Sequence, residues 1–287
     1  MRTAHMRRAP GQAGFTLVEL MVSLMVGMMV VAALLAGYFA ISVSSRHTRA
    51  LTQMTEDASA ALGVLRTHLA QAGYSRPSGV TTSGFQRIYT GAAVVGCDGS
   101  FKDVTAAIDA LACADTTGND ALKDAVSVAY EADTANSIAS GGKPLDCLGN
   151  ALTSIGTAPN AYYLNTSTFY VASGVDGRGA LFCRGNGGGT PQALVENIAD
   201  LQVLYGISTN LNADPVTVGY YGKASAVNMA NVVAVRLCVV VMSSDEVMDD
   251  KTPYFNCSDT QVTPTDKRMY RAFRSTVLLH NRLKANL

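Results

Sequence analysis

The chain has 287 residues, 48% of them hydrophobic, with 22 basic and 22 acidic side chains. A formal net charge of zero argues against a nucleic-acid-binding protein that depends on a strong basic field. Tryptophan is absent, glycine is plentiful at 26 residues, and the apolar residues fall largely in short segments, which favours a turn-rich β domain over a helical bundle.

The N-terminal part of the chain contains a candidate membrane segment. Residues 1–14 hold several arginines and no acid, and the run 20–41 carries no charge. Because about 20 apolar residues at about 1.5 Å each match a hydrocarbon core of about 30 Å, this run can cross a bilayer as one helix. An acid inside a membrane costs several kcal/mol unless it is paired, so Glu19, at the head of the run, is interpreted as a functional residue with a partner. The basic residues predict a cytoplasmic N-terminus and an exported remainder.

The helix is predicted to continue well past the membrane. From Leu51 to Ala72 apolar residues recur every three or four positions, with polar residues on the opposite face. Gly73 supplies a stop, and Pro77 prevents continuation soon after it. The predicted domains are a leader (1–14), a long helix (15–73, of which about 15–41 is transmembrane and 42–73 amphipathic) and a head (74–287).

The head is predicted to be rich in β-strands. Its pattern is weak up to residue 160 and strengthens afterwards, where a glycine run at 185–189 separates two halves of an expected hairpin. The expected elements are a short helix at 106–112 and strands at 87–89, 126–130, 162–164, 168–172, 180–184, 192–196, 198–207, 216–221, 232–242 and 269–279. The fold class that follows is α+β, with a long N-terminal helix packed on an antiparallel β-rich globular head.

Six cysteines all lie beyond the membrane segment: Cys97, Cys113, Cys147, Cys183, Cys238 and Cys257. An even count without metal-type spacing indicates disulfides in an oxidising compartment such as a periplasm. Six cysteines allow fifteen connectivities, and sequence alone does not choose among them. A local argument favours Cys97–Cys113, which closes a polar loop. It also favours Cys238–Cys257, which ties a loop back to a strand, and leaves Cys147 for Cys183.

The contiguous segment Gly14-Phe15-Thr16-Leu17-Val18-Glu19 resembles the prepilin N-terminus of type IV pilins and type II secretion pseudopilins. The resemblance implies that a prepilin peptidase cuts after Gly14 and methylates the new N-terminus at Phe15. It further implies that Glu19 pairs with the α-amine of a neighbouring subunit. An ordinary secretory signal differs, because its cleavage site follows the apolar region, which is then lost. The alternative reading is a plain signal anchor that contains a glutamate.

Further segments resemble PilW-type minor pilins, namely 65–74, 181–184, 194–206, 233–237 and 273–282. Where this chain has His280 before Asn281, the family more often has an arginine. The resemblance implies a non-enzymatic, single-pass inner-membrane protein with its head in the periplasm, later found at the pilus and cell surface. It would prime type IV pilus assembly with other minor pilins, the major pilin and the inner-membrane assembly platform, and support twitching motility, adhesion or DNA uptake.

No motif indicates a catalytic, cofactor or metal site. The histidines at 5, 47, 68 and 280 are dispersed, the glycine run 185–189 lacks the Lys-Ser/Thr ending of a phosphate loop, and the acids at 245–250 do not fit an EF-hand. The predicted partners are therefore proteins and the lipid bilayer, with no nucleic acid. Three alternatives stay open, namely a type II secretion pseudopilin, a signal-anchored periplasmic enzyme, and a tip adhesin that binds DNA or a surface.

Overall fold

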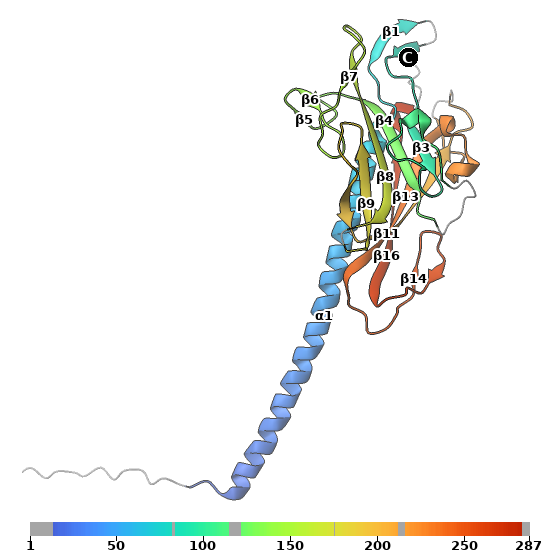
Figure 1. The fold of residues 1–287 in the computed structure, drawn as a ribbon. Helices are drawn as coiled ribbons and strands as arrows, with labels where there is room; N and C mark the ends of the chain where they lie inside the picture. The colour runs from blue at the N-terminus through green and yellow to red at the C-terminus, as the bar shows by residue number, and fades with distance from the viewer. Residues whose placement is uncertain (1–13, 82–83, 115–121, 175, 212–215, 283–287) are drawn as a thin grey trace, which may run out of the picture. The chain divides into compact units, whose positions relative to one another are not determined.

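A computed structural model describes residues 14–81, 84–114, 122–174, 176–211 and 216–282. The chain forms two compact units, one up to Arg49 and the other from Ala50 onward. The leader predicted at 1–14 lies outside the described residues except for Gly14. The long helix α1 (Leu17–Gln71) contributes to both units (Figure 1).

In the first unit, α1 begins next to a threonine cap. The hydroxyl of Thr16 accepts the backbone N–H of Glu19 at 3.3 Å, and the Thr16 carbonyl accepts the N–H of Leu20 at 3.2 Å. Such a cap satisfies helix N–H groups that have no partner within the helix. The large apolar side chains from Leu17 to Ile41 are all exposed. By length and composition, this helix is able to cross a membrane.

In the second unit, α1 buries one stripe of side chains. Met54, Ala58, Ala61, Leu65 and Leu69 are at most 1% exposed and follow the predicted spacing of three and four residues. The stripe joins residues from both main sheets in a single hydrophobic core. The second half of the helix is therefore a structural part of the head.

Gly73 ends the helix as the sequence predicted. Its φ of +71° lies in the left-handed region that favours glycine, and a Cβ at this position would lie 3.0 Å from the Cβ of Ala93. The Gly73 N–H donates to the carbonyl of Ala129 at 2.9 Å, so the chain passes directly from helix to sheet.

The C-terminal part of the chain completes this helix end. The side-chain amide of Asn281 donates to the carbonyls of Ala70 at 3.2 Å and Gln71 at 3.3 Å. Arg87 in turn donates to the carbonyls of Gly73 at 3.1 Å and Asn281 at 2.7 Å. These bonds satisfy helix carbonyls that have no partner within the helix. His280, the residue before Asn281, is exposed. The cap at the helix end therefore depends on the Asn281 amide and does not require a charged side chain at position 280.

The strands form two antiparallel sheets, where the sequence predicted antiparallel strands without dividing them. In the first sheet the strands follow the order β10-β9-β8-β4-β3, and β7 also pairs with β8. The strands of this sheet are β3 (Val94–Cys97), β4 (Ala125–Ala132), β7 (Ser154–Ile155), β8 (Tyr162–Ser173), β9 (Gly179–Gly185) and β10 (Gln192–Glu196). The second has the order β12-β11-β13-β16; its bounds are β11 (Ile198–Ile207), β12 (Tyr220–Gly222), β13 (Val232–Glu246) and β16 (Arg268–Leu278).

The remaining strands form small hairpins apart from these two sheets. Small hairpins are formed by β1 (Pro77–Thr81) with β2 (Gly84–Arg87), β5 (Ala139–Ser140) with β6 (Lys143–Pro144), and β14 (Tyr254–Phe255) with β15 (Gln261–Val262). Single 3-10 turns are η1 (Ile108–Ala110), η2 (Ala224–Ala226), η3 (Met229–Asn231) and η4 (His280–Arg282).

Several sequence predictions needed correction. The helix expected at 106–112 is only the 3-10 turn η1. The strand expected at 87–89 lies earlier, as β2, which ends at Arg87, and the strand expected at 216–221 begins at Tyr220. The strands expected at 162–164 and 168–172 are one strand, β8. Its apolar pattern is interrupted by Asn165 and Ser167, which are buried and bonded to each other at 2.8 Å. The hairpin around 185–189 is present as predicted, formed by β9 and β10.

Three disulfides join the cysteines in the predicted pairs. Their Cα separations are 5.4 Å for Cys97–Cys113, 6.6 Å for Cys147–Cys183 and 5.7 Å for Cys238–Cys257. The last of these ties the loop that holds β14 and β15 to β13. Each bridge is expected to contribute about 2–4 kcal/mol, chiefly by restricting the unfolded chain.

His68 is an ionisable group in the contact between helix and sheet. Its ring lies 5.1 Å from that of Phe169 and 6.0 Å from that of Tyr130, and the Tyr130 hydroxyl is 3.4 Å from Nδ1. Burial lowers the pKa of His68 to about 4, although the charge of Asp146 acts in the opposite direction. The imidazole is therefore neutral in the folded head at neutral pH.

We predict that the contribution of His68 to the stability of the head falls as the pH falls from about 6.5 to about 4. In this window the unfolded chain protonates His68 and the folded chain does not, so this contribution falls by about 1.4 kcal/mol for each pH unit, and the loss stops below the folded pKa. Burial raises the pKa of Asp124 to about 8, which acts in the opposite direction over the same window, so the wild type has to be compared with His68→Gln, which cannot titrate. In denaturant unfolding at several pH values, the wild type should lose stability relative to His68→Gln as the pH falls. Equal slopes would contradict the assignment.

Candidate processing and assembly site

The first candidate site is the segment around the predicted cleavage point. Gly14, Phe15 and Thr16 precede the first turn of α1, and the Phe15 side chain is 83% exposed. The Gly14–Phe15 peptide bond therefore lies outside the hydrogen-bonded helix and on the surface of its unit. A peptidase that cuts here does not have to unwind the helix.

Glu19 is the third residue of α1. Thr16 and Glu19 have the Thr-x-x-Glu spacing of a capping box, and the half made by the Thr16 hydroxyl is formed. The Ser23 hydroxyl donates to the Glu19 backbone carbonyl at 2.7 Å, a bond that does not use the carboxylate. The sequence did not lead us to predict this cap, although Thr16 and Glu19 both lie within the segment from Gly14 to Glu19.

The carboxylate of Glu19 has no cationic neighbour among the described residues. It is the only charged side chain between Leu17 and Arg46, and the side chains around it on the helix are exposed and apolar. A membrane around this segment would leave the carboxylate unpaired at a cost of several kcal/mol. Neutralising the Glu19 carboxylate in a membrane therefore requires a cation from outside this helix.

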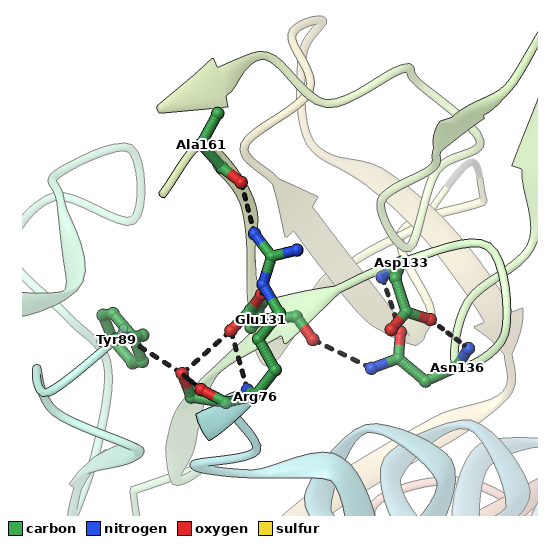
Figure 2. Close-up of polar contacts among 7 residues, drawn as sticks. Arg76, Tyr89, Glu131, Asp133, Asn136 and Ala161 are labelled. Carbon is green, nitrogen blue, oxygen red and sulfur yellow. Dashed lines mark hydrogen bonds and ion pairs between the residues drawn. The ribbon is translucent and has the colours of Figure 1, made fainter. Parts of the chain in front are cut away.

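A second polar cluster lies in the head, where the chain leaves α1 (Figure 2). The carboxylate of Glu131 on β4 accepts the Ser75 hydroxyl at 2.8 Å and the Arg76 backbone N–H at 2.9 Å, and it pairs with the Arg76 guanidinium at 2.7 Å. The Ser75 hydroxyl in turn accepts the Tyr89 N–H at 2.9 Å, and Arg76 also donates to the Ala161 carbonyl. Because both carboxylate oxygens of Glu131 are engaged by structural donors, this cluster anchors the chain where it leaves the helix.

A third group contains buried acids. Asp98 accepts the backbone N–H groups of Ala224 at 2.8 Å and Ser225 at 3.0 Å, and Asp124 accepts that of Val203 at 2.7 Å. Burial raises the pKa of Asp124 to about 8. Both carboxylates hold backbone segments in place, so the raised pKa reflects burial in a structural position.

The remaining sequence candidates do not converge. In the described part of the chain, no three His, Cys, Asp or Glu side chains are arranged to hold a metal. The glycine run 185–189 is the turn between β9 and β10, held by Asp146, which accepts the Gly187 N–H at 2.8 Å. His5 lies outside the described residues.

Two family models match the chain. Residues 168–281 match "Type IV Pilus-assembly protein W", and residues 10–35 match "Prokaryotic N-terminal methylation motif". Among solved structures, a type IV-like pilin from Thermus thermophilus aligns over 80% of this chain and 98% of its own, with 12% identity and a TM-score of 0.42. A comparison with curated proteins gave no match.

A methylation motif at the head of a membrane-length helix, followed by an antiparallel disulfide-containing head, agrees with the type IV pilin-like fold expected from the sequence. Residues 168–281 of that head are similar to the PilW type of pilus-assembly protein. Pilin-like families of this kind are structural and not catalytic. The motif and helix indicate membrane anchoring, and the disulfides indicate an oxidising compartment for the head.

We predict that Glu131→Ala destabilises the head by about 3 kcal/mol, because it leaves an arginine and two buried donors without their acceptor. Asp176→Ala is the matched control. It removes the ion pair between Arg178 and the Asp176 carboxylate, which is 67% exposed, and surface pairs contribute little. Denaturant unfolding of the two variants measures the difference. Equal losses would show that the Glu131 cluster is no more than a surface contact.

Proposed function

We propose that this chain takes part in type IV pilus assembly as a member of the priming or tip complex. The observation that carries the proposal is the lone carboxylate of Glu19 on an exposed, membrane-length apolar helix. A helix of this kind is stable only when lipid or other helices cover it. Its acid is tolerated only when a cation neutralises it.

Processing would supply that cation. Cleavage after Gly14 creates an α-amine on Phe15, which the peptidase then methylates and which remains positively charged. When the helices of two subunits pack side by side, the amine of one lies within reach of the Glu19 carboxylate of the other. Each group alone is costly in lipid, and together they neutralise each other, so the pair favours assembled subunits over separate ones.

The proposed partners follow from this arrangement. The prepilin peptidase acts on the Gly14–Phe15 bond, and the bilayer holds about 15–41 in the inner membrane. Other minor pilins, the major pilin and the inner-membrane assembly platform receive the processed subunit. The head, stabilised by three disulfides, would lie in the periplasm before it reaches the pilus tip at the cell surface. There it would support twitching motility, adhesion or DNA uptake.

The first test is the N-terminus of the mature protein. We expect mass spectrometry of membrane-purified protein to show loss of residues 1–14 and one added methyl group on Phe15. Gly14→Val, which places a branched side chain at the cleavage site, should block processing, whereas Gly11→Ala in the leader should not. A protein that keeps Met1, or is cut beyond Ala36, would exclude prepilin processing.

The second test is the charge of Glu19. In a strain that lacks the native copy, Glu19→Ala and the isosteric Glu19→Gln should leave cleavage largely intact but reduce incorporation into pili by tenfold or more, because the neighbouring amine loses its counter-charge. Glu19→Asp should do less harm. Glu56→Ala, on an exposed part of α1 in the head, is the matched control. Normal piliation with Glu19→Ala would rule out the pairing role.

A further inference from the structure

The strand β16 lies at the end of its sheet and pairs with β13 alone among the described strands. The N–H of Leu279 donates to the carbonyl of Val233 at 2.8 Å, and the N–H of Met269 donates to the Ser243 hydroxyl at 3.0 Å, so odd-numbered residues direct their backbone groups toward β13. In an antiparallel pair the alternate residues direct theirs away. Ala272, Arg274, Thr276 and Leu278 therefore present backbone N–H and C=O groups at an open sheet edge.

A groove of about 580 Å³ follows the C-terminal end of this edge. One wall is the end of β16, from Thr276 to Leu278, together with His280, and the other is the exposed side of α1. The α1 wall consists mostly of small side chains, at Gly63, Thr67 and Ala70. Small residues on this wall leave room for an extended backbone to approach the edge. Leu278, 48% exposed, offers an apolar contact in the same groove.

The charged residues of this strand and of the residues just beside it in the chain are all basic, and two acids from neighbouring loops pair with some of them. Residues 267–282 contain four arginines, a lysine and a histidine and no acid. Arg268 and Arg274 are engaged by Asp266 and Asp259. Arg66 on the groove wall and Arg271, which lies over the Phe273 ring, have no acidic partner among the described residues. Like charges on an edge oppose pairing with another copy of the same strand and favour a segment of opposite charge.

We propose that the open edge of β16 binds an extended acidic segment of a neighbouring pilin by strand addition. The segment would bond to the outward backbone groups of Thr276 and Leu278, lie in the groove beside α1, and place its carboxylates near Arg66 and Arg271. Main-chain bonds would provide the affinity and the arginines the selectivity. The identity of the partner as a pilin rests on the proposed function, whereas the edge and its charge do not.

The test uses the full chain in detergent and two labelled hexapeptides, one alternating glutamate with valine and one alternating lysine with valine. Fluorescence anisotropy should show binding of the glutamate peptide at least tenfold tighter than binding of the lysine peptide. Thr276→Pro removes one outward N–H and should weaken binding of the glutamate peptide by tenfold or more. Thr276→Ala keeps that N–H and should stay within threefold of the wild type.

A second variant tests the proposal even if Thr276→Pro fails to fold. The double substitution Arg66→Glu with Arg271→Glu lies at exposed positions and should reverse the peptide preference. No preference between peptides, equal effects of Thr276→Pro and Thr276→Ala in folded protein, or an unchanged preference in the double variant would each overturn the proposal. Duplex DNA that binds as tightly as the glutamate peptide and is unaffected by Thr276→Pro would overturn it too, since a general anion surface would then suffice.

Experiments in cells distinguish this proposal from the proposed function. We expect Thr276→Pro to reduce surface piliation while N-terminal processing stays normal, and Thr276→Ala to leave both unchanged. If Glu19→Ala blocks incorporation but Thr276→Pro does not, strand addition is refuted and the pilin role stands. If the glutamate peptide binds as expected but Phe15 is never exposed or methylated, the edge is a docking site and the pilin role is refuted.

Discussion

The head depends on one contact, the burial of a single helical stripe against two sheets. Met54, Ala58, Ala61, Leu65 and Leu69 are nearly inaccessible, and the core that surrounds them draws residues from the first sheet, such as Phe169, and from the second, such as Leu237. The helix therefore covers apolar residues that both sheets contribute to this core. Because the same helix also carries the membrane segment, the sequence of its second half is constrained by packing, while its first half is constrained by lipid and by neighbouring helices.

The polar groups near the helix are used in two different ways. In the head they are paired within the chain, as in the Glu131 cluster, where a buried carboxylate meets a hydroxyl, a backbone N–H and a guanidinium. At the other end of α1, the Glu19 carboxylate has no partner among the described residues, although its own backbone N–H is capped by Thr16. A buried acid with internal partners stabilises a fold, and an acid without one points to an interaction with another molecule.

The sequence predicted those features that depend on local patterns. The helix and its stop at Gly73 followed from regular spacing and a single glycine. Two disulfide pairs followed from short loops, and the third joined the two cysteines that were left. Features that depend on distant residues were missed. Strand β3 escaped notice because it is short and contains Gly96, where a Cβ would collide with the Tyr205 ring. The division into two sheets was not predicted, because alternating apolar residues do not identify the neighbouring strand. The cap on the helix end was also missed, since Asn281 lies 211 positions from Ala70.

This last contact has a consequence for the order of folding. The first element of the chain to be made is completed by one of the last, so the carbonyls at the end of α1 must wait for Asn281 until β16 has been synthesised. Contacts between residues so far apart form late, because closing the long intervening loop costs entropy before any bond is gained. A head whose C-terminal residues are not yet in place would have a loosely anchored helix end. Closure by Asn281 would therefore distinguish a completely folded head from an incomplete one.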